Sequence, residues 1–281
     1  MTMLIPLIWM ALARPAAASV EKLPPCPGVR LLRTAGAPPF HTGEELGYEL
    51  SVAGVYVGRL DLKVGAPRAV GEQKAMTLFG RARTNSFASQ FKPFTGRWMS
   101  LLELATLRPL AMRVEARYGE DPRWERASFD GEARGVKTEF LYQGAEGARS
   151  YERREATMFD LLSALYYART RVLEPGPETC QEVYVDKRVW RMDAKVLGVE
   201  NVETPAGPRR AIRAETKLER VPHPDFDPKH KRPSMRMDIF FSADDNRVPL
   251  AFVITTDQVT GRGDLVSWSL RGREGEASWE F

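Results

Sequence analysis

The sequence lacks the common catalytic signatures. It contains no G-x-S-x-G, H-E-x-x-H, G-x-x-x-x-G-K-[ST] or C-x-x-C motif, and no G-x-G-x-x-G that follows a strand pattern. Its 281 residues include only three histidines and two cysteines. A histidine-based triad or metal site therefore has few candidates. We expect a protein that is not an enzyme and needs no cofactor, with a hydrolase of unrecognised site as the less favoured alternative.

Two of the three histidines lie in a single proline-rich segment, residues 221–233. There His223, Asp225, Asp227 and His230 offer nitrogen and oxygen ligands that zinc accepts. The prolines keep this segment extended, however, and nothing in the pattern brings the four groups together. We interpret it as a solvated surface loop and expect no metal site.

Long hydrophobic runs are missing too. Leu4–Ala13 is apolar but too short to span a bilayer, and Ala16–Ala18 provides the small residues that a signal peptidase requires. No basic residue precedes the run, which raises the question of whether the start codon is correctly assigned. We predict a signal peptide over residues 1–18 with cleavage near Ala18, a periplasmic or otherwise exported protein, and no transmembrane segment in the mature chain. The alternative is a buried N-terminal segment.

Neither an excess of one charge nor a rich set of cysteines is present. The 41 Lys and Arg against 37 Asp and Glu leave a net charge of +4, so nothing predicts a nucleic-acid partner. In an exported chain the two cysteines, Cys26 and Cys180, suggest a disulfide between the N-terminal arm and the second half. Two unrelated thiols are an equally good interpretation.

Short apolar–polar alternations, by contrast, fill the chain from residue 40 onward. Leu46–Val52 and Arg59–Val64 predict a hairpin that turns at Ala53-Gly54. Turn signals such as Asp121-Pro122 and Asp186-Lys187 separate the later strands. Together they favour an all-β, mainly antiparallel fold, either barrel-like or a strongly curved sheet or sandwich. The other predicted strands cover residues 74–84, 96–107, 112–118, 124–129, 136–142, 182–185, 189–199, 211–218, 235–241, 248–255, 265–270 and 279–281.

One stretch departs from this pattern. In Met158–Arg171 the apolar residues recur at helical spacing, Thr157 or Asp160 can serve as N-cap, and arginines lie near the C-terminal end. We predict one short helix around 158–171 that plugs or caps the open side of the sheet. Because the composition does not change across it, we expect a Pro- and Ala-rich arm over 19–39 and a single β-rich domain over 40–281.

Candidate ligand-binding residues come from two places. Arg83 and Phe87 belong to a stretch that mixes arginines with aromatic residues, which favours an anionic lipid headgroup or, more simply, a solvated arginine row. Tyr166, Tyr167 and Arg169 lie on the predicted helix. Because adjacent helical residues diverge by about 100°, only one of the two tyrosines can face a cavity, and we expect Tyr166 to pack in the core.

Six stretches, in this order along the chain, resemble the bacterial family catalogued as domain of unknown function 3108. The resemblance covers about residues 40–270 and implies a mostly β protein of the cell envelope, with no activity or catalytic residue to carry over. The six stretches are GEELGY at 43–48, ARTNSF at 82–87, TLRPL at 106–110, SALYYAR at 163–169, ETPAG at 203–207 and DDNRVP at 244–249.

Two functions agree with these observations. The favoured one is a non-enzymatic binding or carrier module for a lipid or other apolar ligand. The alternative is a structural or assembly factor that docks a protein partner in envelope or polysaccharide machinery through its strand edges. A continuous apolar cavity lined by the helix and by strands of both halves would favour the first, and a filled core with an exposed apolar patch the second.

Overall fold

The computed structural model describes Cys26 and residues 38–152, 157–171, 173–221 and 234–269. The predicted signal peptide over 1–18, nearly all of the predicted arm, the His223–His230 segment and the predicted strand at 279–281 lie outside these residues. Within them most of the chain is β-strand, and the strands join in one large, mainly antiparallel sheet that is not closed, as predicted.

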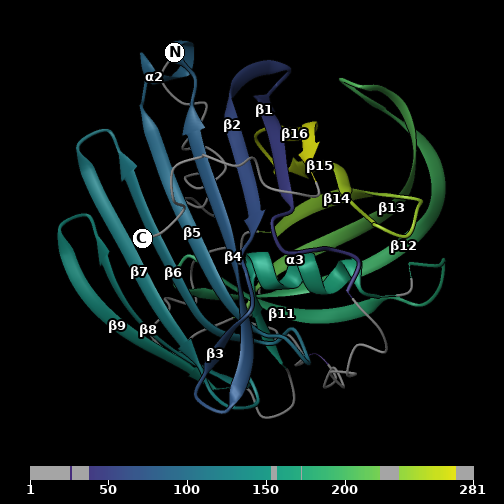
Figure 1. Cartoon of the computed structure of the whole chain (residues 1–281). Helices are drawn as coiled ribbons and strands as arrows, with labels where there is room; N and C mark the ends of the chain where they lie inside the picture. Colours follow the sequence, from purple (N-terminus) through teal and green to yellow (C-terminus); the bar gives the residue numbers. More distant parts are fainter. Residues whose placement is uncertain (1–25, 27–37, 153–156, 172, 222–233, 270–281) are drawn as a thin grey trace, which may run out of the picture.

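The first half of the chain builds one side of this sheet, and the second half builds the other (Figure 1). From one edge to the other the strand order is β10-β11-β12-β13-β14-β15-β16-β1-β2-β4-β5-β6-β7-β8-β9, with β3 beside β4. The first-half strands are β1 Glu45–Val52, β2 Val55–Val64, β3 Arg68–Val70, β4 Gln73–Thr84, β5 Phe94–Glu103, β6 Pro109–Tyr118, β7 Asp121–Phe129, β8 Gly135–Tyr142 and β9 Ala145–Glu152. The second-half strands are β10 Met158–Asp160, β11 Thr179–Val185, β12 Arg188–Thr204, β13 Gly207–Arg220, β14 Ser234–Ser242, β15 Pro249–Thr255 and β16 Thr260–Ser269.

Two-residue turns join many of the neighbouring strands. The predicted turns at Ala53-Gly54 and Asp186-Lys187 are confirmed, and all four residues have positive φ, as the turns that match strand twist require. The predicted turn at Asp121-Pro122 is wrong, because Asp121 already pairs with Tyr118 and the chain turns at Gly119-Glu120. Gly119 supplies the positive φ there, while Pro122 is tolerated near the start of a strand.

The two ends of the sheet curl toward each other without joining in a ladder. A buried apolar cluster combines residues of β6 to β8, such as Met112 and Val136, with Met158 of β10 and Tyr184 of β11. The Met158 amide donates to the Ala133 carbonyl at 2.6 Å, and the Tyr151 hydroxyl donates to the Lys187 carbonyl at 2.7 Å. Side chains and loops therefore complete a barrel-like enclosure that the backbone ladder leaves open.

The central helix, α3 Leu161–Arg169, lies inside this curved sheet (Figure 1). Its N-cap is Asp160, whose carboxylate accepts from the amides of Leu162 and Ser163. The helix is shorter than predicted, since residues 158–160 pair in parallel with β11 and form β10. A second helix, α2 Ser86–Ser89, was not predicted, and Asn85 caps it. The predicted strand at 96–107 also ends early, at Glu103.

A buried ion pair fixes the C-terminal end of α3. Arg169 and Glu44 both have fully buried side chains, and the guanidinium donates to the two carboxylate oxygens at 2.6 and 2.9 Å. Arg169 also donates to the carbonyls of Pro39 and Asn246. Three of the stretches that carry the family resemblance, around residues 44, 166 and 246, thus meet in one buried cluster.

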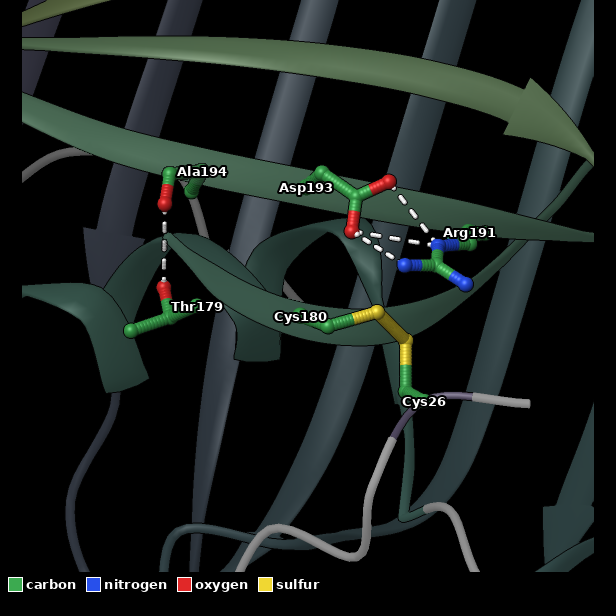
Figure 2. Close-up of a disulfide and its surroundings, with 6 residues drawn as sticks. All are labelled: Cys26, Thr179, Cys180, Arg191, Asp193 and Ala194. Atoms are coloured by element: carbon green, nitrogen blue, oxygen red, sulfur yellow. Dashed lines mark hydrogen bonds and ion pairs between the residues drawn. A yellow bond between two sulfur atoms is a disulfide. The ribbon is translucent and has the colours of Figure 1, made fainter. Parts of the chain in front are cut away.

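A disulfide joins the N-terminal arm to the sheet. Cys26 bonds to Cys180 on β11, close to the Arg191–Asp193 ion pair of β12 (Figure 2). The two cysteines are 154 positions apart in the sequence. Of the two interpretations that the sequence leaves open, the structure therefore shows the disulfide, which holds Cys26 against β11, the strand next to the edge strand β10.

Candidate functional site

The curved sheet encloses a cavity of about 1050 Å³. This volume lies at the upper end of the range of roughly 300–1,000 Å³ that is typical of small-molecule sites. The cavity is bordered by strands of both halves and by α3, and its lining is mostly apolar. Exposed residues such as Arg83 and Arg171 also border it, so it opens to solvent.

Strand alternation explains why the lining is apolar. On β6 the residues Met112, Val114, Ala116 and Tyr118 all border the cavity, whereas Arg113 and Glu115 between them form an ion pair outside it. On the opposite side β14 contributes Met237, Ile239 and Phe241. The helix adds Leu162, Leu165 and Ala168 from the face that it turns inward. On β6 and β14 one face of the strand thus builds the wall of the cavity.

The five candidate ligand residues do not gather at one site. Tyr167 and Arg83 border the cavity. Tyr166 packs edge-on against Phe40 in the core, and its exposed fraction is only 1%. Arg169 is committed to Glu44 and does not border the cavity. Phe87 is 51% exposed on α2, where its ring packs against Phe91.

A cluster of polar groups borders the cavity where the two ends of the sheet approach each other. Glu125 of β7 borders the cavity with an exposed fraction of 7%. Its Oε1 atom accepts three hydrogen bonds, which come from the Tyr184 hydroxyl at 2.5 Å, the Thr138 hydroxyl at 3.2 Å and the Lys187 amide at 3.2 Å. This carboxyl group therefore links β7 and β8 to the turn between β11 and β12.

Two cations flank Glu125, and each is already paired. Arg123 lies over the rings of Tyr118 and Tyr142, at 4.3 and 4.2 Å from their centroids, and bonds to Asp121 at 2.7 Å. The Lys187 ammonium lies 3.6 Å from the Tyr142 centroid and 2.8 Å from the Asp186 carboxylate. The positive charges are thus balanced locally.

Burial governs the protonation of this polar end. It raises the pKa of the Glu125 carboxyl above its usual value, although the hydrogen bond from Tyr184 opposes the shift. It also raises the pKa of the Tyr184 hydroxyl well above the usual range and that of Tyr118 to about 12. Both tyrosines are therefore neutral donors at physiological pH.

Sequence reasoning missed this polar end. Glu125 lies in the same alternation phase as Ala127 and Phe129, which are buried. A carboxylate in the apolar phase of a predicted strand is the signal that could have singled it out. Tyr184 and Lys187 carry no comparable signal, since they reach Glu125 only because the sheet curls.

Other site classes have little support in the part of the chain that the structure covers. Among its residues, no group of three or more His, Cys, Asp or Glu side chains is arranged to hold a metal ion. None of its helices is long and apolar enough to cross a membrane.

Comparisons with known proteins agree with the fold and assign no activity. The family model described as "Protein of unknown function (DUF3108)" matches residues 47–262. No curated protein is similar enough in sequence to match the chain. A β-barrel-like protein of the domain of unknown function DUF1849 from Brucella abortus has a TM-score of 0.54 at 9% identity, over 82% of this chain and 98% of that one. It shares the barrel-like fold.

Two further structures cover the chain at a lower TM-score. A proposed exported protein of Bacteroides fragilis with a YmcC-like fold has a TM-score of 0.39 at 9% identity, over 83% of this chain and 98% of that one. A proposed lipoprotein of Parabacteroides distasonis has a TM-score of 0.39 at 12% identity, over 83% of this chain and 99% of that one.

Proposed function

The chain belongs to the DUF3108 family, and from this premise we propose that it is an exported, non-enzymatic binding or carrier protein for a lipid or another apolar ligand. The observation that supports the proposal is the apolar cavity of about 1050 Å³ between α3 and strands of both halves. Filling an apolar cavity of this size removes much hydrocarbon from water, at about 25 cal/mol per Å² of apolar surface buried. A hydrocarbon chain is the simplest ligand for such a wall.

The export part of the proposal rests on the N-terminal sequence and on the disulfide. A disulfide persists in oxidising compartments such as the periplasm and is rare in the cytosol. The bond between Cys26 and Cys180 therefore agrees with an exported protein. We favour ligand binding over the partner-docking role because the space under the helix is hollow.

Native mass spectrometry of the full chain, expressed with export to the periplasm and purified without detergent, tests the proposal. We expect a stoichiometric adduct of lipid size, which organic extraction then identifies. Ala116→Trp puts a large ring on the cavity wall and should remove the adduct. Arg117→Trp is the matched control, since the next residue of β6 is exposed and does not border the cavity.

The following results would contradict the proposal. An apo mass in every preparation, together with no binding of the neutral apolar dye Nile red, would overturn the proposal. An adduct that survives Ala116→Trp but disappears in Arg117→Trp would place the ligand outside the cavity.

A further inference from the structure

We propose that the cavity takes an amphiphile with a hydroxyl-bearing, uncharged headgroup, which is held by Glu125, while its hydrocarbon chain lies along the apolar wall. This inference rests on the proposed function and names the class of ligand. It starts from the Glu125 carboxyl group, in which the two oxygens differ in their hydrogen bonding.

The structural task of Glu125 uses only one of its oxygens. Oε1 accepts from Tyr184, Thr138 and the Lys187 amide, and these bonds hold the turn at Asp186-Lys187 in place. Both turn residues have positive φ although neither is glycine, so the turn needs such support. A carboxylate has room for further hydrogen bonds on its second oxygen.

The second oxygen is free to meet a ligand. Among the described residues no hydrogen bond to Oε2 is found, and Oε2 is not one of their fully buried unpartnered atoms, so a molecule in the cavity that Glu125 borders can reach it. A carboxylate oxygen that lines an apolar space without a protein partner is satisfied by water or by a polar group of a ligand. Oε2 therefore marks a polar anchor point at the end of an apolar space.

The surrounding charges decide which headgroup fits. Arg123 pairs with Asp121, while Lys187 and Arg188 share Asp186. With the Glu125 carboxylate, three negative charges balance these three positive ones, and none of the three is left over for a phosphate or a carboxylate. An anionic headgroup beside Oε2 would also face the carboxylates of Glu125 and Asp186 at short range. Local electrostatics therefore disfavour an anion.

A hydroxyl group suits Oε2 in both protonation states. It donates to the ionised carboxylate and accepts from the neutral acid, in which the proton would occupy Oε2 because three donors already surround Oε1. Tyr118, Tyr142 and Phe140, which border the same region, provide aromatic surface for the carbon skeleton of the headgroup. Acylglycerols and glycolipids have this combination of a hydroxylated head and a hydrocarbon chain.

Displacement of Nile red from the delipidated full-length protein tests the assignment. The two competitors are a 1-O-alkylglycerol and the fatty acid of the same chain length, at mildly alkaline pH. In the wild type we expect the alkylglycerol to compete about tenfold better or more, as the gain of a charge-assisted hydrogen bond predicts. This preference alone could come from the cost of burying any fatty-acid carboxylate.

The variant Glu125→Gln separates the two explanations. Its amide oxygen can still accept from Tyr184, Thr138 and Lys187, while its NH₂ group replaces Oε2 with a donor. We expect the preference for the alkylglycerol to fall at least tenfold and to approach or pass equality. Glu139→Gln is the matched control, because this glutamate is exposed on the neighbouring strand β8 and should keep the wild-type preference.

The outcomes distinguish this inference from the proposed function. Equal competition in the wild type, or a preference that Glu125→Gln leaves unchanged, would overturn the headgroup assignment while the cavity still binds apolar molecules. Failure of Nile red to bind the wild type, together with an apo mass in every preparation, would instead refute the proposed function itself.

Discussion

At the scale of single residues, the most constrained side chain of the helix is structural. Arg169 is a candidate ligand residue of the predicted helix, but it lies buried against Glu44, with its guanidinium 5.3 and 5.0 Å from the ring centroids of Phe40 and Tyr166. The two Nη atoms of its guanidinium donate to two carboxylate and two carbonyl oxygens, while the buried Nε has no hydrogen-bond partner among the described residues.

Arg169→Met should therefore lower the free energy of unfolding by about 3–5 kcal/mol, because it leaves the Glu44 carboxylate buried without its partner. Adding Glu44→Gln should recover part of this loss. Urea unfolding at neutral pH measures both changes. As a control, Arg97→Met breaks an exposed pair with Glu115 and should cost about 0–1 kcal/mol. Equal losses at the two positions would show that burial of the Arg169 pair is unimportant.

Because burial raises the pKa of Glu125, we expect the stability of the protein to depend on pH. Since its pKa is raised in the folded state, the contribution of this group is fully present below the unfolded pKa and is lost as pH rises through the folded pKa. The uncharged variant Glu125→Gln should thus match the wild type in acid and become the more stable of the two toward neutral pH. Each tenfold difference in proton affinity is worth about 1.4 kcal/mol. Thermal unfolding of both proteins across this pH range checks the sign, and a constant difference would contradict it.

At the scale of elements, local patterns predicted the hairpins well. The alternation in Leu46–Val52 and the turn at Ala53-Gly54 are local properties, and the structure has β1, β2 and their turn as expected. Tyr166 packs in the core as expected, and its neighbour Tyr167, which belongs to the same buried cluster, also borders the cavity. Such predictions succeed because the residues concerned are neighbours in sequence.

The elements that were missed depend on distant partners. Met158–Asp160 continues the helical pattern but is extended because it pairs with β11. β9 was not predicted at all, since Gly147 and Arg149 stand where an alternating strand would show apolar residues. Arg149 bonds instead to the Lys187 carbonyl across the gap between the sheet ends. Periodicity within one segment carries no information about such pairings.

At the scale of the whole molecule, the curl of the sheet creates the candidate site. Glu125 and Tyr184 are 59 positions apart, and they meet only because the two ends of a non-closed sheet approach each other. The same curl leaves the hollow space that α3 fills in part. The cavity could be predicted in outline, as a space lined by the helix and by both halves, but its polar end could not.

The disulfide between Cys26 and Cys180 also constrains the chain as a whole. It closes a loop across 154 positions, which includes the whole first half of the sheet and α3. A cross-link over so long a loop restricts the unfolded chain strongly, and natural disulfides contribute about 2–5 kcal/mol to stability.

The double variant Cys26→Ser/Cys180→Ser should therefore unfold at clearly lower urea concentration while it keeps the β-rich circular dichroism spectrum. The intact wild type should be lighter than its reduced form by two hydrogen atoms, as mass spectrometry measures. An unchanged mass on reduction would show that the purified protein lacks the bond, and an unchanged midpoint in the double variant would show that the bond anchors the segment around Cys26 without stabilising the sheet.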